Sequence, residues 1–202
     1  MRITQNSKLL LFDLGGMLVD FSGIRDLSPM LRTPRSEDDI RQKWSICPTI
    51  RAFETGLLTP VQFSEQFVAT WDLNLTPASF LHEFRTWTRG FLQGAQEILV
   101  GLKDRFRLAC LSNSNASHWE QNQDRGLFAY FESSLSSHML GYHKPDPLIY
   151  QSALDRLHLE PEAVIFFDDS APNVEGAQKA GIRAFQVSGV SELCVKPMPS
   201  NT

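Results

Sequence analysis

The sequence lacks two features that would indicate work at a membrane or on a nucleic acid. No apolar run is long enough to cross a bilayer, and positive charge is not in excess. The 202 residues carry 19 Lys and Arg against 23 Asp and Glu, which gives a net charge of −4. This balance argues against a nucleic acid or an anionic membrane surface as partner and favours a small molecule.

Cysteine is also scarce, which argues against a disulfide framework. The three cysteines, Cys47, Cys110 and Cys194, are odd in number and show no metal-ligand or redox spacing. The N-terminal residues contain no small-residue cleavage site. We therefore expect reduced cysteines, a cytoplasmic location and, because no oligomerisation signal is visible, a monomer.

One stretch near the N-terminus joins a buried strand to a sharp turn. Residues 9–12 are Leu-Leu-Leu-Phe, a bulky apolar run typical of a strand buried on both faces. Asp13 follows this run, and Gly15 and Gly16 indicate that the chain turns there. Asp13 is thus predicted at the carboxyl end of a strand, where open α/β sheets bind ligands.

The second half of the chain alternates between predicted strands and predicted helices. We expect strands at residues 106–111, 131–136, 163–167 and 182–187. Helices are expected at residues 95–103, 116–123 and 148–157, and from Pro172 onwards. This alternation predicts an α/β fold with a doubly wound parallel sheet and helices on both of its faces.

Between residues 20 and 93, helix signals replace strand signals. Ser36 precedes an acidic first turn, and Thr59 and Thr76 each precede a proline, as N-terminal helix caps often do. We therefore predict an α/β core at residues 1–16 and 94–190, an inserted helical domain at residues 17–93 and a tail at residues 191–202. The aromatic side chains of the insert are expected to form its own core.

Polar side chains follow three of the predicted strands and precede one of the helices. In a doubly wound sheet these side chains would meet at one edge. Two carboxylates about 4 Å apart repel each other by about 4 kcal/mol at an effective dielectric constant of about 20, so a positive charge must lie among them. Oxygen ligands with room for water and phosphate suit Mg²⁺, so we expect a magnesium ion among them. The residues of this predicted site are Asp13, Ser112, Asn113, Lys144, Asp168 and Asp169.

These residues lie in four motifs that resemble those of the haloacid dehalogenase superfamily of hydrolases. The resemblance covers nearly the whole chain, and the helical insert is similar to the C1-type cap of that family. Within the family, the chain looks most like the sugar-phosphate and small-metabolite phosphatases near bacterial α-glucose-1-phosphatase. The motifs are Phe12-Asp13-Leu14-Gly15-Gly16, Leu111-Ser112-Asn113, His143-Lys144-Pro145-Asp146 and Phe167-Asp168-Asp169-Ser170.

The resemblance implies a Mg²⁺-dependent phosphatase that acts on a small phosphorylated metabolite. Asp13 would attack the phosphoryl group and carry it as an aspartyl-phosphate. Ser112 would hold a phosphate oxygen, Lys144 would hold the nucleophile and the phosphate together, and Asn173 would orient the acidic pair. The implied phosphate-binding residues are Gly15, Gly16, Ser112, Asn113 and Lys144, and the implied metal ligands are Asp13, Gly15, Asp168 and Asp169.

At one position the chain departs from the family pattern. Most phosphatases of the family carry an acid/base aspartate two residues after the nucleophile, where this chain has Gly15. The glycine keeps the backbone carbonyl that would contact the metal, but loss of a general acid typically lowers the rate by about 10²–10⁴. Asp20, His118 and His143 lie near the motifs and are candidate replacements, although each is expected at the surface.

Two other functions stay open at this point. A 2-haloacid dehalogenase uses the same fold and nucleophile without a metal, but the resemblance there predicts an aromatic residue after the nucleophile and no acidic pair like Asp168-Asp169. A non-catalytic protein that binds phosphate or a partner is made possible by Gly15. Which of Asp168 and Asp169 would contact the metal directly is open as well.

Overall fold

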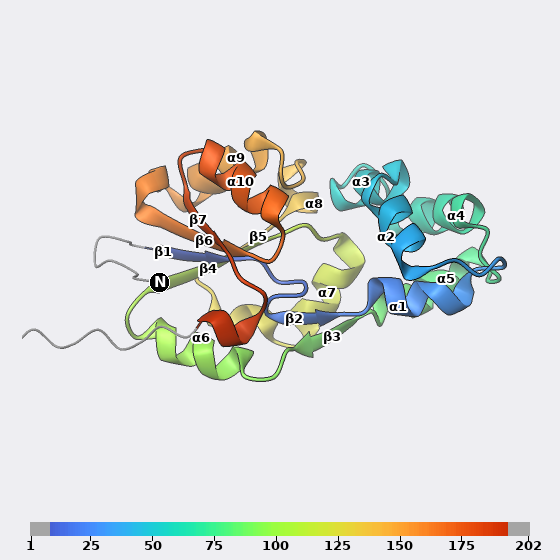
Figure 1. Cartoon of the computed structure of the whole chain (residues 1–202), viewed down its shortest axis with the longest axis horizontal. Helices are drawn as coiled ribbons and strands as arrows, with labels where there is room; N and C mark the ends of the chain where they lie inside the picture. Colours follow the sequence, from blue (N-terminus) through green and yellow to red (C-terminus); the bar gives the residue numbers. More distant parts are fainter. Residues whose placement is uncertain (1–8, 194–202) are drawn as a thin grey trace, which may run out of the picture.

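A parallel sheet lies between two layers of helices, with a smaller helical lobe beside it (Figure 1). A computed structural model describes residues 9–193. Within them, five parallel strands lie in the order β5-β4-β1-β6-β7, which confirms the predicted α/β class and the doubly wound sheet. The strands are β1 Leu9–Phe12, β4 Arg107–Ser112, β5 Ser133–Ser136, β6 Val164–Asp168 and β7 Arg183–Gln186.

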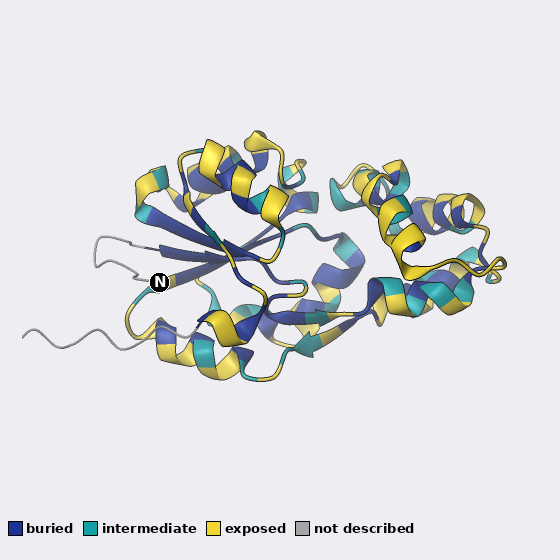
Figure 2. Ribbon diagram, viewed as in Figure 1, coloured by how far each residue is buried: buried dark blue, intermediate teal, exposed yellow. Residues whose placement is uncertain are grey.

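The central strand β1 is buried on both faces because helices cover each side of the sheet (Figure 2). Leu10 and Phe12 pack into the core on one side, and Leu9 and Leu11 pack into the core on the other. This two-sided burial explains the unbroken apolar run. The covering helices are α6 Ala95–Lys103 and α7 Ala116–Asp124 on one face, and α9 Pro147–Leu157 and α10 Ala171–Lys179 on the other.

Shorter helices connect these elements, and the inserted segment supplies six more. The connecting helices are η2 Leu127–Tyr130, α8 Ser137–Leu140 and η3 Pro161–Ala163. The helices of the insert, called the helical lobe below, are α1 Gly23–Leu27, η1 Ser28–Met30, α2 Glu37–Ser45, α3 Pro48–Glu54, α4 Pro60–Trp71 and α5 Pro77–Arg85.

The helical lobe has an aromatic core of its own, as expected from the spacing of its apolar residues. The rings of Phe53 and Phe63 stack with centroids 4.2 Å apart, and Phe67 and Phe80 stack at 4.9 Å. At the start of α4, Thr59 Oγ1 accepts the Gln62 N–H while Gln62 Oε1 accepts the Thr59 N–H. This reciprocal capping satisfies two donors that a helix N-terminus leaves free.

The prediction missed two strands and three short helices in this segment. Strands β2 Val19–Phe21 and β3 Thr88–Phe91 form a small antiparallel sheet where the lobe joins the sheet domain, and helices α1, η1 and α3 are also present. The two strands are too short, and Asp20 and Arg89 too polar, to produce a readable alternation. The helical lobe therefore occupies only the middle of the predicted 17–93 insert.

The last described residues pack on the sheet domain. Helix η4 Val190–Leu193 buries Val190 and Leu193 in the core beside α6, so residues 191–193, predicted to belong to a tail, are part of the sheet domain. Residues 194–202, with Cys194, lie outside the described residues. Cys47 and Cys110 are buried free thiols. Among residues 9–193, no helix has the length and apolar character that a membrane span requires.

Candidate active site

Three adjacent strands end at one edge of the sheet and bring together polar groups from distant parts of the sequence. Asp13 directly follows β1, Ser112 ends β4 and Asp168 ends β6. Strand β1 pairs with both neighbours, and the Asp13 N–H donates to the Phe167 carbonyl at 2.9 Å. The carboxyl end of β1 is therefore held firmly against β6, with the Asp13 side chain beyond it.

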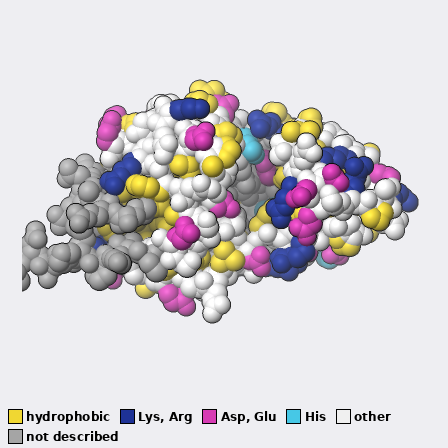
Figure 3. All heavy atoms as spheres, viewed as in Figure 1, with side chains coloured by type: hydrophobic (Ala, Val, Ile, Leu, Met, Phe, Trp, Pro, Cys, Tyr) yellow, Lys and Arg dark blue, Asp and Glu magenta, His cyan; other side chains and the backbone are white. Residues whose placement is uncertain are grey.

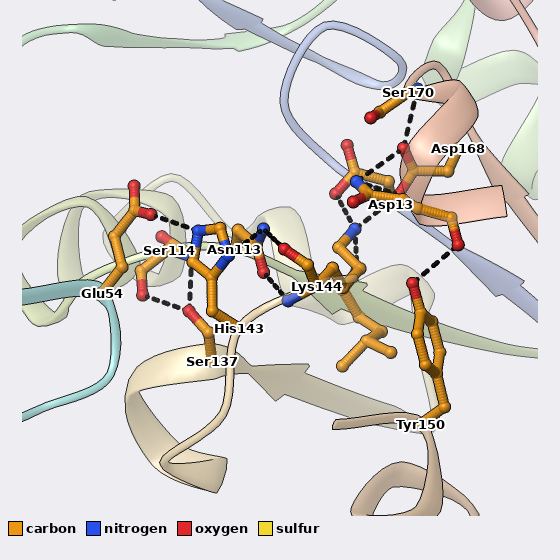
Figure 4. Close-up of polar contacts among 12 residues, drawn as sticks. Asp13, Glu54, Asn113, Ser114, Ser137, His143, Lys144, Tyr150, Asp168 and Ser170 are labelled. Carbon is orange, nitrogen blue, oxygen red and sulfur yellow. Dashed lines mark hydrogen bonds and ion pairs between the residues drawn. The ribbon is translucent and has the colours of Figure 1, made fainter. Parts of the chain in front are cut away.

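Lys144 lies at the centre of this group and is 1% exposed (Figure 4). Its Nζ donates to Asp13 Oδ1 at 2.7 Å, to Asp168 Oδ2 at 2.6 Å and to the Leu111 carbonyl at 2.9 Å. An ammonium group has three protons, so each of them has an acceptor here. Burial alone would lower the pKa of Lys144, but the two carboxylates outweigh it and raise the pKa. Lys144 is therefore a permanent positive charge.

Asp168 is fully buried and is held by groups at the start of α10. Its Oδ1 accepts the Ser170 N–H at 2.9 Å, and Asn173 Nδ2 donates to Oδ1 at 3.0 Å and to Oδ2 at 3.1 Å. The Tyr150 hydroxyl donates to the Asn173 carbonyl at 2.7 Å and so fixes that residue in turn (Figure 4). Asn173 therefore orients Asp168, whereas Asp169 is exposed and lines the cavity.

The carboxylates fit a divalent cation. Asp13, Asp168 and Asp169 each offer an oxygen, and these atoms lie within 4.8 Å of one another. Three negative charges and the one positive charge of Lys144 leave −2, which a single Mg²⁺ would balance. Burial raises the pKa of Asp13 to about 7, with Lys144 opposing and Asp168 adding to the rise. Burial and Asp168 also raise the pKa of Asp169, and a bound cation would favour the charged forms.

The glycines after Asp13 let the loop pass close to the acidic pair. Gly16 has a φ of +79°, and a Cβ added there would lie 2.7 Å from Asp169 Oδ2. No other residue type fits that position without displacing the carboxylate. Gly15 lies beside it on the wall of the same cavity, where it offers backbone atoms only.

Asn113 differs from Ser112 in what its side chain does. Ser112 is buried at the end of β4 and lines the cavity. The Asn113 side chain instead accepts the Lys144 N–H at 2.8 Å and donates to the Lys144 carbonyl at 3.0 Å. Its amide therefore holds the backbone that carries the lysine, so any contact with phosphate would come from its backbone. Sequence alone gave no sign of this pairing across 31 residues.

A cavity of about 420 Å³ lies over the carboxylates, where the sheet domain and the helical lobe face each other. The space-filling view shows the surface hollowed between the two parts (Figure 3). Asp13, Lys144 and Asp169 lie on the wall formed by the sheet domain. The sequence prediction missed the polar residues of the opposite wall, because they come from α2 and α3 and follow no strand. They are Arg41, Ser45, Arg51 and Glu54.

One pair of side chains bridges the cavity from the sheet domain to the lobe (Figure 4). Asn113 Nδ2 lies 3.2 Å from His143 Nδ1, and His143 Nε2 lies 2.8 Å from Glu54 Oε2. The Asn113 oxygen already accepts the Lys144 N–H, so its amide nitrogen donates to Nδ1 and the imidazole proton sits on Nε2. His143 Nε2–H therefore donates to Glu54 Oε2, and this hydrogen bond links α3 to the loop that carries Lys144.

The three candidate acid/base residues have different surroundings. Asp20 is partly exposed beside Arg25, at 3.7 Å, and does not line the cavity above Asp13. His143 lines that cavity and is 19% exposed. The expectation that His118 lies at the surface is wrong, because it is 4% exposed and its Nε2 donates to the Phe84 carbonyl at 2.7 Å. His118 therefore joins α7 to the C-terminus of α5, and it lines a small cavity of about 70 Å³ that shares Gly15 and Ser112 with the cavity above Asp13.

The sequence matches a family model and one curated relative over most of its length, and another relative over less than half of it. A family model described as haloacid dehalogenase-like hydrolase matches residues 7–181. A protein named phosphatase MT3486, from Mycobacterium tuberculosis, is 27% identical over 196 residues, which cover 88% of this chain and 86% of that protein. A phosphorylated carbohydrates phosphatase from Thermotoga maritima is 36% identical over 91 residues, 44% of this chain and 42% of that protein.

Solved structures share the fold. A magnesium complex of the HAD family enzyme bt-2542 from Bacteroides thetaiotaomicron aligns with a TM-score of 0.75. The alignment covers 90% of this chain and 93% of that chain at 22% sequence identity. At this identity the likeness shows the fold, and the chemistry of the present chain has to be argued from its own residues.

Proposed function

Because this chain belongs to the haloacid dehalogenase-like hydrolase family, we propose that it is a Mg²⁺-dependent phosphatase of a small phosphorylated metabolite. The observation that carries the proposal is the set of three carboxylates around one buried lysine at the floor of a cavity. Relatives named as phosphatases support the same reaction class. The helical lobe would act as the cap over the site.

Asp13 is the proposed nucleophile. Its carboxylate would attack phosphorus and form an aspartyl-phosphate, and water would then release inorganic phosphate. Ser112, at the neighbouring strand end, would hold a non-bridging oxygen, and Lys144 would hold Asp13 in position and offset the charge that develops. Magnesium bound by Asp13, Asp168, Asp169 and the Gly15 carbonyl would supply the charge that lets an anionic phosphate approach the carboxylates.

With Gly15 at the position of the family's acid/base aspartate, another group has to protonate the leaving group. His143 is the candidate acid/base residue that lines the cavity, and its Nε2 proton is directed at Glu54. We therefore expect the enzyme to hydrolyse esters with good leaving groups, such as p-nitrophenyl phosphate, faster relative to alkyl phosphates than a phosphatase with a general acid does.

The test is a phosphate-release screen over sugar phosphates, phosphorylated acids, nucleotides and p-nitrophenyl phosphate, with Mg²⁺ or with EDTA. Asp13→Asn is the blank, because it removes the nucleophile and keeps the size of the side chain. Turnover that needs Mg²⁺ and is lost in Asp13→Asn, while its circular dichroism spectrum is unchanged, supports the proposal. Equal turnover by wild type and Asp13→Asn would refute it.

The same preparation separates the two alternative functions. Chloride release from 2-chloropropionate in EDTA would identify a dehalogenase. Binding of phosphate and Mg²⁺ without turnover of any ester would identify a non-catalytic binding protein. Either result would replace the phosphatase proposal.

A further inference from the structure

Two arginines lie on the wall of the cavity opposite the catalytic carboxylates. Arg41 comes from α2 and Arg51 from α3, so both belong to the helical lobe. Lys144 is the positively charged side chain at the floor of the cavity, and all three of its protons already have acceptors in the protein. The arginines therefore face the part of a substrate that extends away from the transferred phosphate.

Neither arginine is neutralised by its surroundings. Within residues 9–193, the side chain of Arg51 makes no ion pair and no hydrogen bond. The side chain of Arg41 makes one ion pair, between its Nη2 and Glu37 Oε2 at 3.5 Å. The side chains of that pair are 63% and 66% exposed, and pairs so well solvated contribute little. The acidic residue on the same wall, Glu54, is held by His143. Both guanidinium groups thus have donors free for a ligand.

We propose that the leaving group of the substrate carries a second anionic group, a carboxylate or a second phosphate, which Arg51 and Arg41 bind. This inference rests on the proposed phosphatase function and names its substrate class. A guanidinium matches either anion with two parallel hydrogen bonds. Hydrolysis breaks the bond between phosphorus and the leaving-group oxygen, water supplies hydroxide to phosphorus and a proton to that oxygen, and the second anion stays unchanged.

The cavities are consistent with a substrate that extends from the floor to this wall. The cavity of about 420 Å³ over Asp13 shares Phe21, Arg41 and Trp44 with a neighbouring one of about 710 Å³. Arg41 therefore lies where the two cavities meet, whereas Arg51 lines only the cavity over Asp13. An anion on a short leaving group would reach Arg51, and one on a longer leaving group would reach Arg41 as well.

The experiment compares matched esters that differ in the second anion. With Mg²⁺, kcat and KM are measured for 3-phosphoglycerate against glycerol 3-phosphate, and for fructose 1,6-bisphosphate against fructose 6-phosphate. The first pair tests a carboxylate and the second pair a phosphate. The variants are Arg51→Met and Arg41→Met, and the control is Arg85→Met, an exposed arginine of α5 that does not line the cavity.

We expect wild type to prefer at least one of the two esters whose leaving group carries a second anionic group, and Arg51→Met to reduce that preference about 10-fold, mainly through KM. A hydrogen-bonded charge pair contributes about 1.5–3 kcal/mol, which corresponds to about 10–100-fold. Arg85→Met should leave the preference unchanged. Equal kcat/KM within both pairs, or an equal loss for all four esters in Arg51→Met, would overturn the inference.

A failure of the phosphatase proposal would be recognised separately, as no turnover of any ester. In that case the same esters are tested by calorimetry for binding to the Mg²⁺-loaded protein. Tighter binding of 3-phosphoglycerate or fructose 1,6-bisphosphate that is lost in Arg51→Met would support the arginine site without catalysis. Equal binding, or none, would overturn it.

Discussion

Lowering the pH from neutrality is expected to destabilise the fold through His118. This ring is buried between α5 and α7, with Nε2 donating to the Phe84 carbonyl and Nδ1 3.1 Å from the Asn115 amide. The side-chain oxygen of Asn115 accepts the backbone N–H of His118, so the side-chain nitrogen of Asn115 donates to His118 Nδ1. A second proton on the imidazole would therefore break a hydrogen bond as well as bury a charge.

The size of the effect follows from the pKa of His118. Burial lowers it from 6.5 to about 4, although the Phe84 carbonyl opposes the change. Each pKa unit corresponds to about 1.4 kcal/mol, so the full difference is worth about 3 kcal/mol. Between these two values the unfolded chain binds a proton that the folded chain does not. The free energy of unfolding is thus intact above pH 6.5 and falls as the pH drops, by about 2 kcal/mol at about pH 5.

The assay is urea unfolding at about pH 7.5 and about pH 5 for wild type and His118→Gln, whose amide can still donate to Phe84. Other groups titrate in both proteins and cancel in the comparison, including Asp13, whose raised pKa makes it act in the opposite direction. We expect wild type to lose about 2 kcal/mol more than His118→Gln. The same pH dependence in both proteins would refute the reasoning.

Three further results are expected from the site. Mg²⁺ at about 100 times its Kd should raise the free energy of unfolding by about 2.7 kcal/mol, and Asp169→Asn should reduce this gain; a gain of the same size in the variant would contradict the metal site. Lys144→Met in EDTA should cost about 3–5 kcal/mol in urea unfolding, because it leaves buried carboxylates unpaired, and adding Asp13→Asn should restore part of it. Glu54→Ala should speed amide hydrogen exchange in α3 by removing the acceptor of His143 Nε2, whereas Glu54→Gln keeps an oxygen there and should exchange like wild type.

The sheet and the floor of the site could be predicted because their signals are local. Four apolar residues before Asp13 define a strand buried on both faces, and the end of a parallel strand fixes where the next side chain lies. The same logic located Ser112 and Asp168. Lys144 follows no strand; its place just before a predicted helix put it at the same edge of the sheet, and the order of the motifs agreed with that position.

The opposite wall could not be predicted because it depends on how the helices of the lobe are oriented. Arg41 and Arg51 look like ordinary exposed arginines in the sequence, and nothing local shows that α2 and α3 turn them towards Asp13. The burial of His118 could not be predicted for a related reason. Its partner is the Phe84 carbonyl near the end of α5, and the last carbonyls of a helix take whatever donor the tertiary structure provides.

The pairing of Phe21 with Thr88 brings the two chain connections of the helical lobe side by side. The chain leaves the sheet domain on β2 and returns on its antiparallel partner β3, so the two ends of the lobe are cross-strand neighbours. A two-residue turn can join such neighbours. A lobe whose two ends lie equally close together can therefore be exchanged at this hairpin, during evolution or by engineering, without a change in the order of the strands in the sheet domain.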